Sequence, residues 1–271
     1  MTRSVSTVVT HNNTNQMTFT GLIGAVCMFP LRVIIRASVA LGIHPNTLTL
    51  IGVLINVGAA WALGKQHFLL AFVVMIVANI FDFIDGKVAH ITGTVSRFGA
   101  FWDSTLDRFS DIALFLGLTY LYASLRRTDY VMIASLAMMF SIMTSYARAR
   151  AESLIDKCKV GFMERPERIV LLMIGASTNR MGAVMWVILV LSIVTVANRI
   201  HFTYLVLNEK PAPQGTNPLS RVFWRAFFWT DERTTLPYDL WVIAILAFIW
   251  LTPPDWVRDP TASGLGIWGL F

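Results

Sequence analysis

The chain has 271 residues, of which 55% are hydrophobic and only 14% are charged, whereas about 25% of the residues of a soluble domain are charged. This balance excludes a disordered or collagenous chain and disfavours an ordinary cytosolic enzyme. The mean hydropathy of +0.61 instead indicates a polytopic membrane protein. The net charge is +6, and in a membrane protein such an excess of basic residues usually lies in loops that meet anionic headgroups.

The N-terminal part predicts a tail and a surface helix. Residues 1–18 are rich in Ser, Thr and Asn, and we expect them to be disordered. Residues 22–41 are apolar, but Pro30 interrupts them, and Arg32 and Arg36 lie one helical turn apart. This pattern favours an amphipathic helix in the headgroup plane over a failed first span.

Six apolar segments follow, joined by short connections. They predict membrane helices over residues 47–63, 68–89, 98–123, 130–151, 166–177 and 183–207. Short connections make successive helices antiparallel neighbours. The predicted fold is therefore an all-α integral membrane bundle of six transmembrane helices, which together with the interfacial helix forms one domain over residues 19–207.

The basic residues predict the orientation. Thirteen Lys and Arg residues lie in the N-terminal segment and after the second, fourth and sixth predicted spans, against four in the opposite loops. Basic loops stay in the cytoplasm. We therefore expect the N-terminus and the even-numbered loops to be cytoplasmic.

Residues 208–271 predict a C-terminal extension. Residues 208–220 are polar, residues 222–229 are aromatic and basic, and residues 240–251 are apolar. The apolar run has only about twelve residues, whereas a span needs about 20. It predicts an interfacial or re-entrant segment, with a seventh short span as the alternative.

Carboxylates occur where lipid-facing residues are expected. Asp82 and Asp85 lie on one helical face near the end of the second span, and Asp103 and Asp107 share a face near the start of the third. Four isolated carboxylates at the centre of spans would cost about 10–14 kcal/mol. Divalent cations offset this cost best, and carboxylate oxygens suit one or two Mg²⁺ or Mn²⁺ ions.

Three small residues, Gly86, Ala89 and Gly99, lie on the same two faces. They leave room for a ligand, or they let the helices pack closely. The carboxylates have an alternative too, which is pairing with Lys87, Arg97 or Arg108. Salt bridges do not require this spacing, so the metal site is the favoured interpretation.

Residues 82–107 carry the pattern Asp-x2-Asp-Gly-x2-Ala-x9-Gly-x3-Asp-x3-Asp. It resembles the signature of the CDP-alcohol phosphotransferases, integral membrane enzymes that move a phosphatidyl group or a phosphoalcohol from a CDP donor onto an alcohol. The resemblance also implies the six-span architecture and a homodimer. One position departs from the family, because His90 stands where Arg is usual.

The resemblance implies a role for each motif residue. Asp82, Asp85 and Asp103 would ligate metal, and Asp107 would complete a second metal site and act as general base. A hydroxyl would attack the β-phosphorus of the CDP lipid and release CMP without a covalent enzyme intermediate. The nucleotide-binding residues would be Asp82, Gly86, Ala89, Gly99 and Asp103.

Five arginines at the cytoplasmic level predict the acceptor site. They are Arg148, Arg150, Arg165, Arg168 and Arg199. Clustered guanidinium groups suit a phosphate monoester, because each can bind two oxygens. The alternatives are a purely topological role and helix pairing, such as Glu164 with Arg168.

The same segments are similar to those of bacterial phosphatidylinositol-phosphate synthases. This resemblance implies CDP-diacylglycerol and inositol 1-phosphate as substrates, in a bacterial cytoplasmic membrane with the active site facing the cytoplasm. Glycerol 3-phosphate or inositol as acceptor, and CDP-archaeol or CDP-inositol as donor, stay open. A divalent-cation transporter is a distant alternative, and nucleic-acid binding has no support.

Overall fold

The computed structural model describes residues 31–210, 217, 224 and 236–262. Within these residues the regular secondary structure is helical, and no strand is found. The predicted disordered tail at 1–18 lies outside the described residues. So do the start of the predicted surface helix and all but one residue of the aromatic stretch at 222–229.

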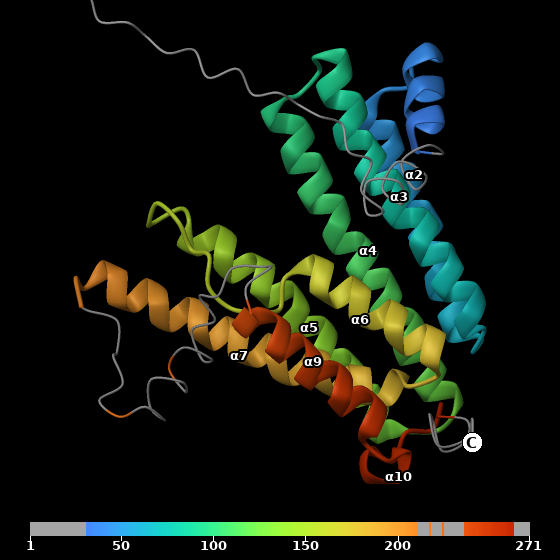
Figure 1. Cartoon of the computed structure of the whole chain (residues 1–271), viewed down its shortest axis with the longest axis vertical. Coiled ribbons are helices and arrows are strands. Elements are labelled where there is room, and N and C mark those ends of the chain that lie inside the picture. The colour runs from blue at the N-terminus through green and yellow to red at the C-terminus, as the bar shows by residue number, and fades with distance from the viewer. Residues whose placement is uncertain (1–30, 211–216, 218–223, 225–235, 263–271) are drawn as a thin grey trace, which may run out of the picture.

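All six predicted membrane segments are helices, with bounds within three residues of those expected (Figure 1). A further helix covers 31–40, and two lie in the C-terminal extension. The labelled helices are α2 (Pro45–Gly64), α3 (Phe68–Thr92), α4 (Arg97–Ser124), α5 (Thr128–Ala151), α6 (Arg165–Thr178), α7 (Met181–Leu207), α9 (Leu236–Leu251) and α10 (Pro254–Val257).

Four of the described helices are long and apolar enough to cross a membrane: α2, α3, α5 and α7. The chain is therefore a membrane protein, as predicted. Two predicted spans do not meet these criteria. Helix α4 carries five charged residues in its first fifteen, and α6 has 14 residues, whereas a span needs about 20.

The helices pack in two groups. Helix α2 packs on α3 and α4, and α7 packs on α5 and α6, while contacts of α4 with α5 and of α3 with α6 join the groups. Helix α4 approaches α2 closely because Gly117 faces the backbone of Ala60, where a β-carbon would overlap the carbonyl. Small residues permit this approach between membrane helices.

Residues 31–40 of the predicted surface helix are helical. Ile35 is buried against Ile84 and Val88 of α3 and Leu48 of α2. Its arginines at 32 and 36 are exposed. The apolar face therefore packs on the α2–α3 pair.

The C-terminal extension folds back on the bundle. Helix α9 begins beside α6, where the Tyr238 hydroxyl donates to Glu167, and it ends beside the start of α7, where Arg180 donates to the Thr252 carbonyl at 3.0 Å (Figure 1). Beyond α10, Asp259 accepts a hydrogen bond of 2.8 Å from the Gly182 amide in the first turn of α7. Helix α9 has 16 residues, four more than the predicted run.

Candidate functional site

The carboxylates of α3 and α4 meet at one end of the bundle. Asp82, Asp85 and Asp103 each offer an oxygen atom, and these atoms lie within 4.8 Å of one another. A short turn makes this possible, because Gly93 ends α3 with a φ of 66° and Ser96 caps α4 through the Gly99 amide. Three of the four aspartates that the sequence analysis singles out therefore lie together.

The donor set suits a hard divalent cation. Three carboxylates this close repel one another unless positive charge lies among them. Oxygen-only ligands match the preference of Mg²⁺ and Mn²⁺ rather than that of softer metals. The residues present therefore fit the ion that the sequence predicts.

Asp85 has a partner on α2. Its carboxylate is buried and accepts a hydrogen bond of 2.6 Å from the Thr49 hydroxyl. The bond fixes one oxygen of Asp85 and orients the other, which is the usual task of a residue behind a metal ligand. Sequence reasoning missed Thr49. Its signal was a threonine one turn into α2, at the level of the aspartates.

A cavity of about 170 Å³ lies beside the carboxylates, between the start of α2, the end of α3 and the start of α4. Its lining includes Asp85 and Asp103 and the predicted nucleotide residues Gly86, Ala89 and Gly99. A β-carbon on Gly86 would meet nothing within 4 Å. This supports room for a ligand over close helix packing at that position.

Two residues that sequence reasoning had not assigned to this cavity, Asn46 and His90, also line it. The Asn46 carbonyl accepts a hydrogen bond of 3.1 Å from the Trp102 indole of α4, so the α2 entry is tied to α4. His90, the position that departs from the family pattern, lies in the cavity wall. Asp82 is not among the lining residues.

Arg165 bridges the carboxylates. Its guanidinium lies 2.8 Å from Asp82, 3.0 Å from Asp107 and 3.7 Å from Asp111. Asp107 lies outside the cluster of three and contacts Arg165 instead. The alternative partners of the carboxylates named above, Lys87, Arg97 and Arg108, do not form these ion pairs.

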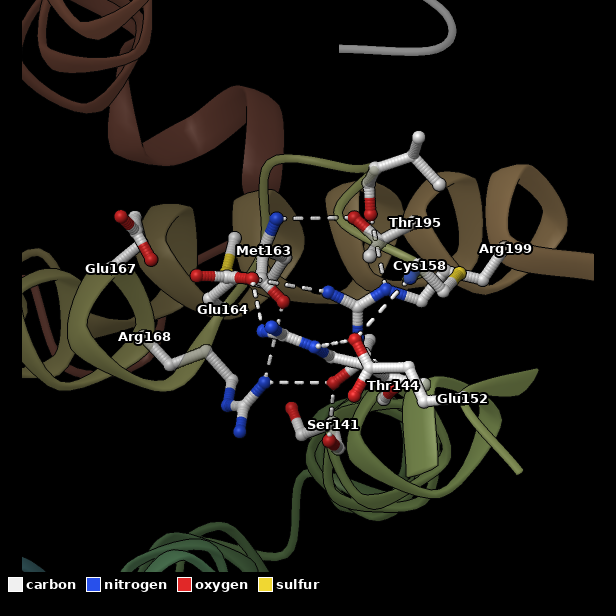
Figure 2. Close-up of polar contacts among 12 residues, drawn as sticks. Ser141, Thr144, Glu152, Cys158, Met163, Glu164, Glu167, Arg168, Thr195 and Arg199 are labelled. Carbon is white, nitrogen blue, oxygen red and sulfur yellow. Dashed lines mark hydrogen bonds and ion pairs between the residues drawn. The ribbon is translucent and has the colours of Figure 1, made fainter. Parts of the chain in front are cut away.

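Glu164 forms ion pairs with two more of the predicted arginines, of which Figure 2 labels Arg199. One of its oxygens lies 2.9 Å from Arg148 and 3.4 Å from Arg199. Arg148 also binds Glu152 at 3.0 Å. Burial raises the pKa of Glu152, but the hydrogen bonds from Arg148 and the Cys158 amide, together with the charges of Arg148 and Arg199, hold that pKa below its usual value.

Arg168 and Arg199 are anchored inside the protein, each side chain 2% exposed. Arg168 donates to Asp111 at 2.8 Å and to the Thr144 hydroxyl at 2.9 Å. Arg199 donates to the carbonyls of Val160 and Thr144. These bonds tie α5, α6 and α7 together, and the ion-pair partner of Arg168 is Asp111 rather than Glu164.

The five predicted arginines therefore separate. Four belong to a connected network, whereas Arg150 is exposed and donates to the neighbouring Ser153 hydroxyl at 3.2 Å. Arg165 is the member of the network that contacts Asp82 and Asp107. All five residues are arginines predicted to lie at the same membrane level, so the sequence could not show that Arg150 is exposed while the other four join the network.

Clustered carboxylates, a neighbouring cavity and a cationic network at one end of a membrane helix bundle are typical of a membrane enzyme that handles phosphate groups. Residues 42–203 match the CDP-alcohol phosphatidyltransferase family, and the chain belongs to it. The chain is thus a phospholipid-synthesis transferase, as the sequence predicts.

Among the members of this family, the chain is similar in sequence to enzymes named as synthases of inositol-containing phospholipids. The chain is 36% identical over 173 residues to the archaetidylinositol phosphate synthase of Pyrococcus horikoshii, covering 64% of this chain and 89% of that protein. It is 35% identical over 169 residues to the phosphatidylinositol phosphate synthase of Mycobacteroides abscessus, covering 59% of this chain and 77% of the relative.

The fold is also similar to solved structures of a phosphatidylinositol phosphate synthase. The Mycobacterium tuberculosis phosphatidylinositol phosphate synthase with CDP-DAG bound superposes with a TM-score of 0.61 at 29% identity, covering 64% of this chain and 93% of that one. The same enzyme in complex with manganese and citrate gives a TM-score of 0.61 at 30% identity, covering 64% and 88%.

Proposed function

We propose that this enzyme transfers the phosphatidyl group of CDP-diacylglycerol to inositol 1-phosphate and releases CMP. One observation carries the proposal. Arg165 joins the arginine network to the aspartates, 2.8 Å from Asp82 and 3.0 Å from Asp107. A cation able to bind an acceptor's phosphate therefore lies next to carboxylates that suit a metal. Relatives named archaetidylinositol phosphate synthase and phosphatidylinositol phosphate synthase support this choice of acceptor.

The aspartates would hold Mg²⁺ or Mn²⁺. Asp82, Asp85 and Asp103 form one site, and Asp107 completes a second. Two ions in these sites would neutralise the pyrophosphate of the donor and make CMP a better leaving group. The manganese complex of the mycobacterial relative supports a divalent metal.

The cavity would bind the cytidine nucleotide. Gly86, Ala89 and Gly99 line it and leave room for the base and ribose, and Asp82 and Asp103 complete this site. An inositol hydroxyl attacks the β-phosphorus, one P–O bond forms, and the P–O bond to CMP breaks. Asp107 takes the proton of that hydroxyl.

The arginines would divide the work on the acceptor. Arg165 and Arg148 are the more accessible of the network, with side chains 19% and 36% exposed, and are placed to contact phosphate. Arg168 and Arg199 complete the acceptor site mainly by fixing its shape. Arg150 adds positive charge at the surface near it.

The membrane arrangement is part of the proposal. It comprises six spans, of which α4 and α6 are the two that carry charge or are short, and the interfacial helix before them, all within residues 19–207. Residues 208–271 would form an extension that is partly membrane-associated. The enzyme acts as a homodimer in a bacterial cytoplasmic membrane, with the site at the cytoplasmic surface.

The test is CMP release by the purified protein with CDP-diacylglycerol and Mg²⁺. Inositol 1-phosphate, glycerol 3-phosphate, inositol and serine are supplied in parallel. Release that depends on inositol 1-phosphate supports the proposal, and release with another acceptor rejects that part of it. CDP-archaeol is tested as a second donor, because one relative is an archaetidylinositol phosphate synthase.

A further inference from the structure

The C-terminal extension lies beyond the residues that match the family, 42–203, yet α9 contacts the loop that leads into α6. We propose that Tyr238 of α9 is a positioning residue that holds this loop, and with it the arginines that bind the acceptor. The inference rests on the proposed function for the identity of the acceptor. The positioning role of Tyr238 itself does not depend on which acceptor the enzyme uses.

Tyr238 touches both ends of the segment that enters α6. Its ring packs against Phe162, with 5.8 Å between the ring centroids. Its hydroxyl donates a hydrogen bond of 3.3 Å to the Glu167 carboxylate in the first turn of α6. Phe162 is itself buried in the main core. One side chain of the extension thus spans residues 162–167.

This segment carries the arginine network. The Val160 carbonyl accepts from Arg199 at 3.0 Å, and the Met163 carbonyl accepts from Arg168 at 3.4 Å. The Met163 amide donates to the Thr195 hydroxyl of α7 at 3.1 Å (Figure 2). Glu164 and Arg165, which bind Arg148 and the aspartates, follow directly. A shift of this segment would therefore disturb at least one contact of every guanidinium group in the network.

Among the described residues, few other contacts of α9 reach the segment that enters α6. An apolar cavity of about 700 Å³ separates much of α9 from α7, and another of about 390 Å³ lies between α9 and α6. Phe162 and Ile245 line both cavities. Ile249 is buried in the main core toward the other end of α9, so the contacts of Tyr238 are the ones that lie at the α6 entry.

The first experiment compares Tyr238→Phe and Tyr238→Ala with the wild type. The Phe variant removes only the hydroxyl, and we expect its KM for inositol 1-phosphate to rise about fivefold, the effect of one lost hydrogen bond. The Ala variant also loses the ring contact, and its KM should rise further. The KM for CDP-diacylglycerol and the melting temperature should change little in the Phe variant. Tyr204→Phe is the matched control, because Tyr204 is half exposed and its hydroxyl meets Lys210.

The second experiment needs no substrate. Hydrogen exchange of the amides at 160–168 should be faster in both Tyr238 variants than in the wild type, while exchange in α2–α4 is unchanged. This measurement stands whichever alcohol the enzyme uses. If CMP release shows a different acceptor, the KM comparison is made with that acceptor, so failure of the proposed substrate is distinguished from failure of the positioning role.

A double-mutant cycle completes the test. Glu167→Met alone, which removes the accepting oxygen at similar side-chain length, should raise the acceptor KM, and combined with Tyr238→Phe it should add little, because both changes break the same hydrogen bond. Additive effects would overturn the proposal. So would equal rises in both KM values, or exchange at 160–168 that is unchanged in the Ala variant.

Discussion

Arg165 of α6 donates a hydrogen bond of 2.8 Å to the carboxylate of Asp82 on α3, 83 residues earlier in the chain. The contact joins two groups of residues that the sequence analysis treats separately, the acidic pattern and the arginine cluster. Its geometry makes the entry of α6 part of the carboxylate site.

Replacing Asp85 by Asn should lower CMP release by about a thousandfold or more. The change removes one charged ligand while keeping the side chain's size, and the lost metal chemistry is worth several kcal/mol. Activity is measured as CMP release and folding as the elution volume and melting temperature. Asp156→Asn, at an exposed loop position, is the control and should match the wild type. Full activity of Asp85→Asn would reject the metal site.

Chelation should stop turnover. EDTA is expected to abolish CMP release, and Mg²⁺ or Mn²⁺ added in excess should restore it, because oxygen ligands hold these ions reversibly. An independent measurement is the melting temperature, which Mn²⁺ should raise in the wild type by binding the folded state. Asp103→Asn should abolish this rise. A chelated enzyme that keeps its activity would contradict the proposal.

Replacing Arg165 by Gln should raise the acceptor KM at least tenfold. Arg165 reaches the aspartates, and a charged hydrogen bond to phosphate is worth about 1.5–3 kcal/mol. The donor KM should change less. Arg150→Gln is the matched control, because Arg150 is exposed and outside the network. An acceptor KM that responds to Arg150 but not to Arg165 would reverse the assignment.

Replacing Gly117 by Ala should destabilise the α2–α4 contact. The added β-carbon would overlap the Ala60 carbonyl, and overpacking of this kind costs about 1–3 kcal/mol. Gly58→Ala is the control, because a β-carbon there meets nothing within 4 Å and Ala favours a helix. The melting temperature in detergent should fall for Gly117→Ala and hold or rise for Gly58→Ala.

Replacing Asp259 by Asn should lower the melting temperature. The Asp259 carboxylate accepts from the Gly182 amide at the start of α7, and the loss of a charged partner there costs about 0.5–2 kcal/mol. Asp255→Asn is the control, since Asp255 is exposed on α10. Equal melting temperatures for the two variants would show that the cap does not contribute.

The sequence predicts the helices well, because each apolar segment is bounded by polar or turn residues such as Pro45 and Gly93. It predicts the carboxylate cluster because spacings of three and four residues place Asp82 with Asp85 and Asp103 with Asp107 on helical faces. The number of spans is harder to predict. The charge of α4 and the length of α6 depart from the composition of an ordinary span.

Long-range contacts could not be predicted. Nothing in the local pattern distinguishes Arg150, which is exposed, from Arg168, which is buried against Asp111. The difference arises from tertiary packing, which a pattern along one helix does not contain. The same holds for Thr49, whose partner Asp85 lies on another helix.

The hydrogen bond between Gly182 and Asp259 also orders events during synthesis of the chain. The first turn of α7 leaves the ribosome 77 residues before the carboxylate that caps it. Until Asp259 has been synthesised, the Gly182 amide at the start of α7 must find another hydrogen-bond acceptor, such as water. A chain that stops before α10 would therefore keep Asp82, Asp85, Asp103 and Asp107 but would lack the carboxylate that accepts from the Gly182 amide.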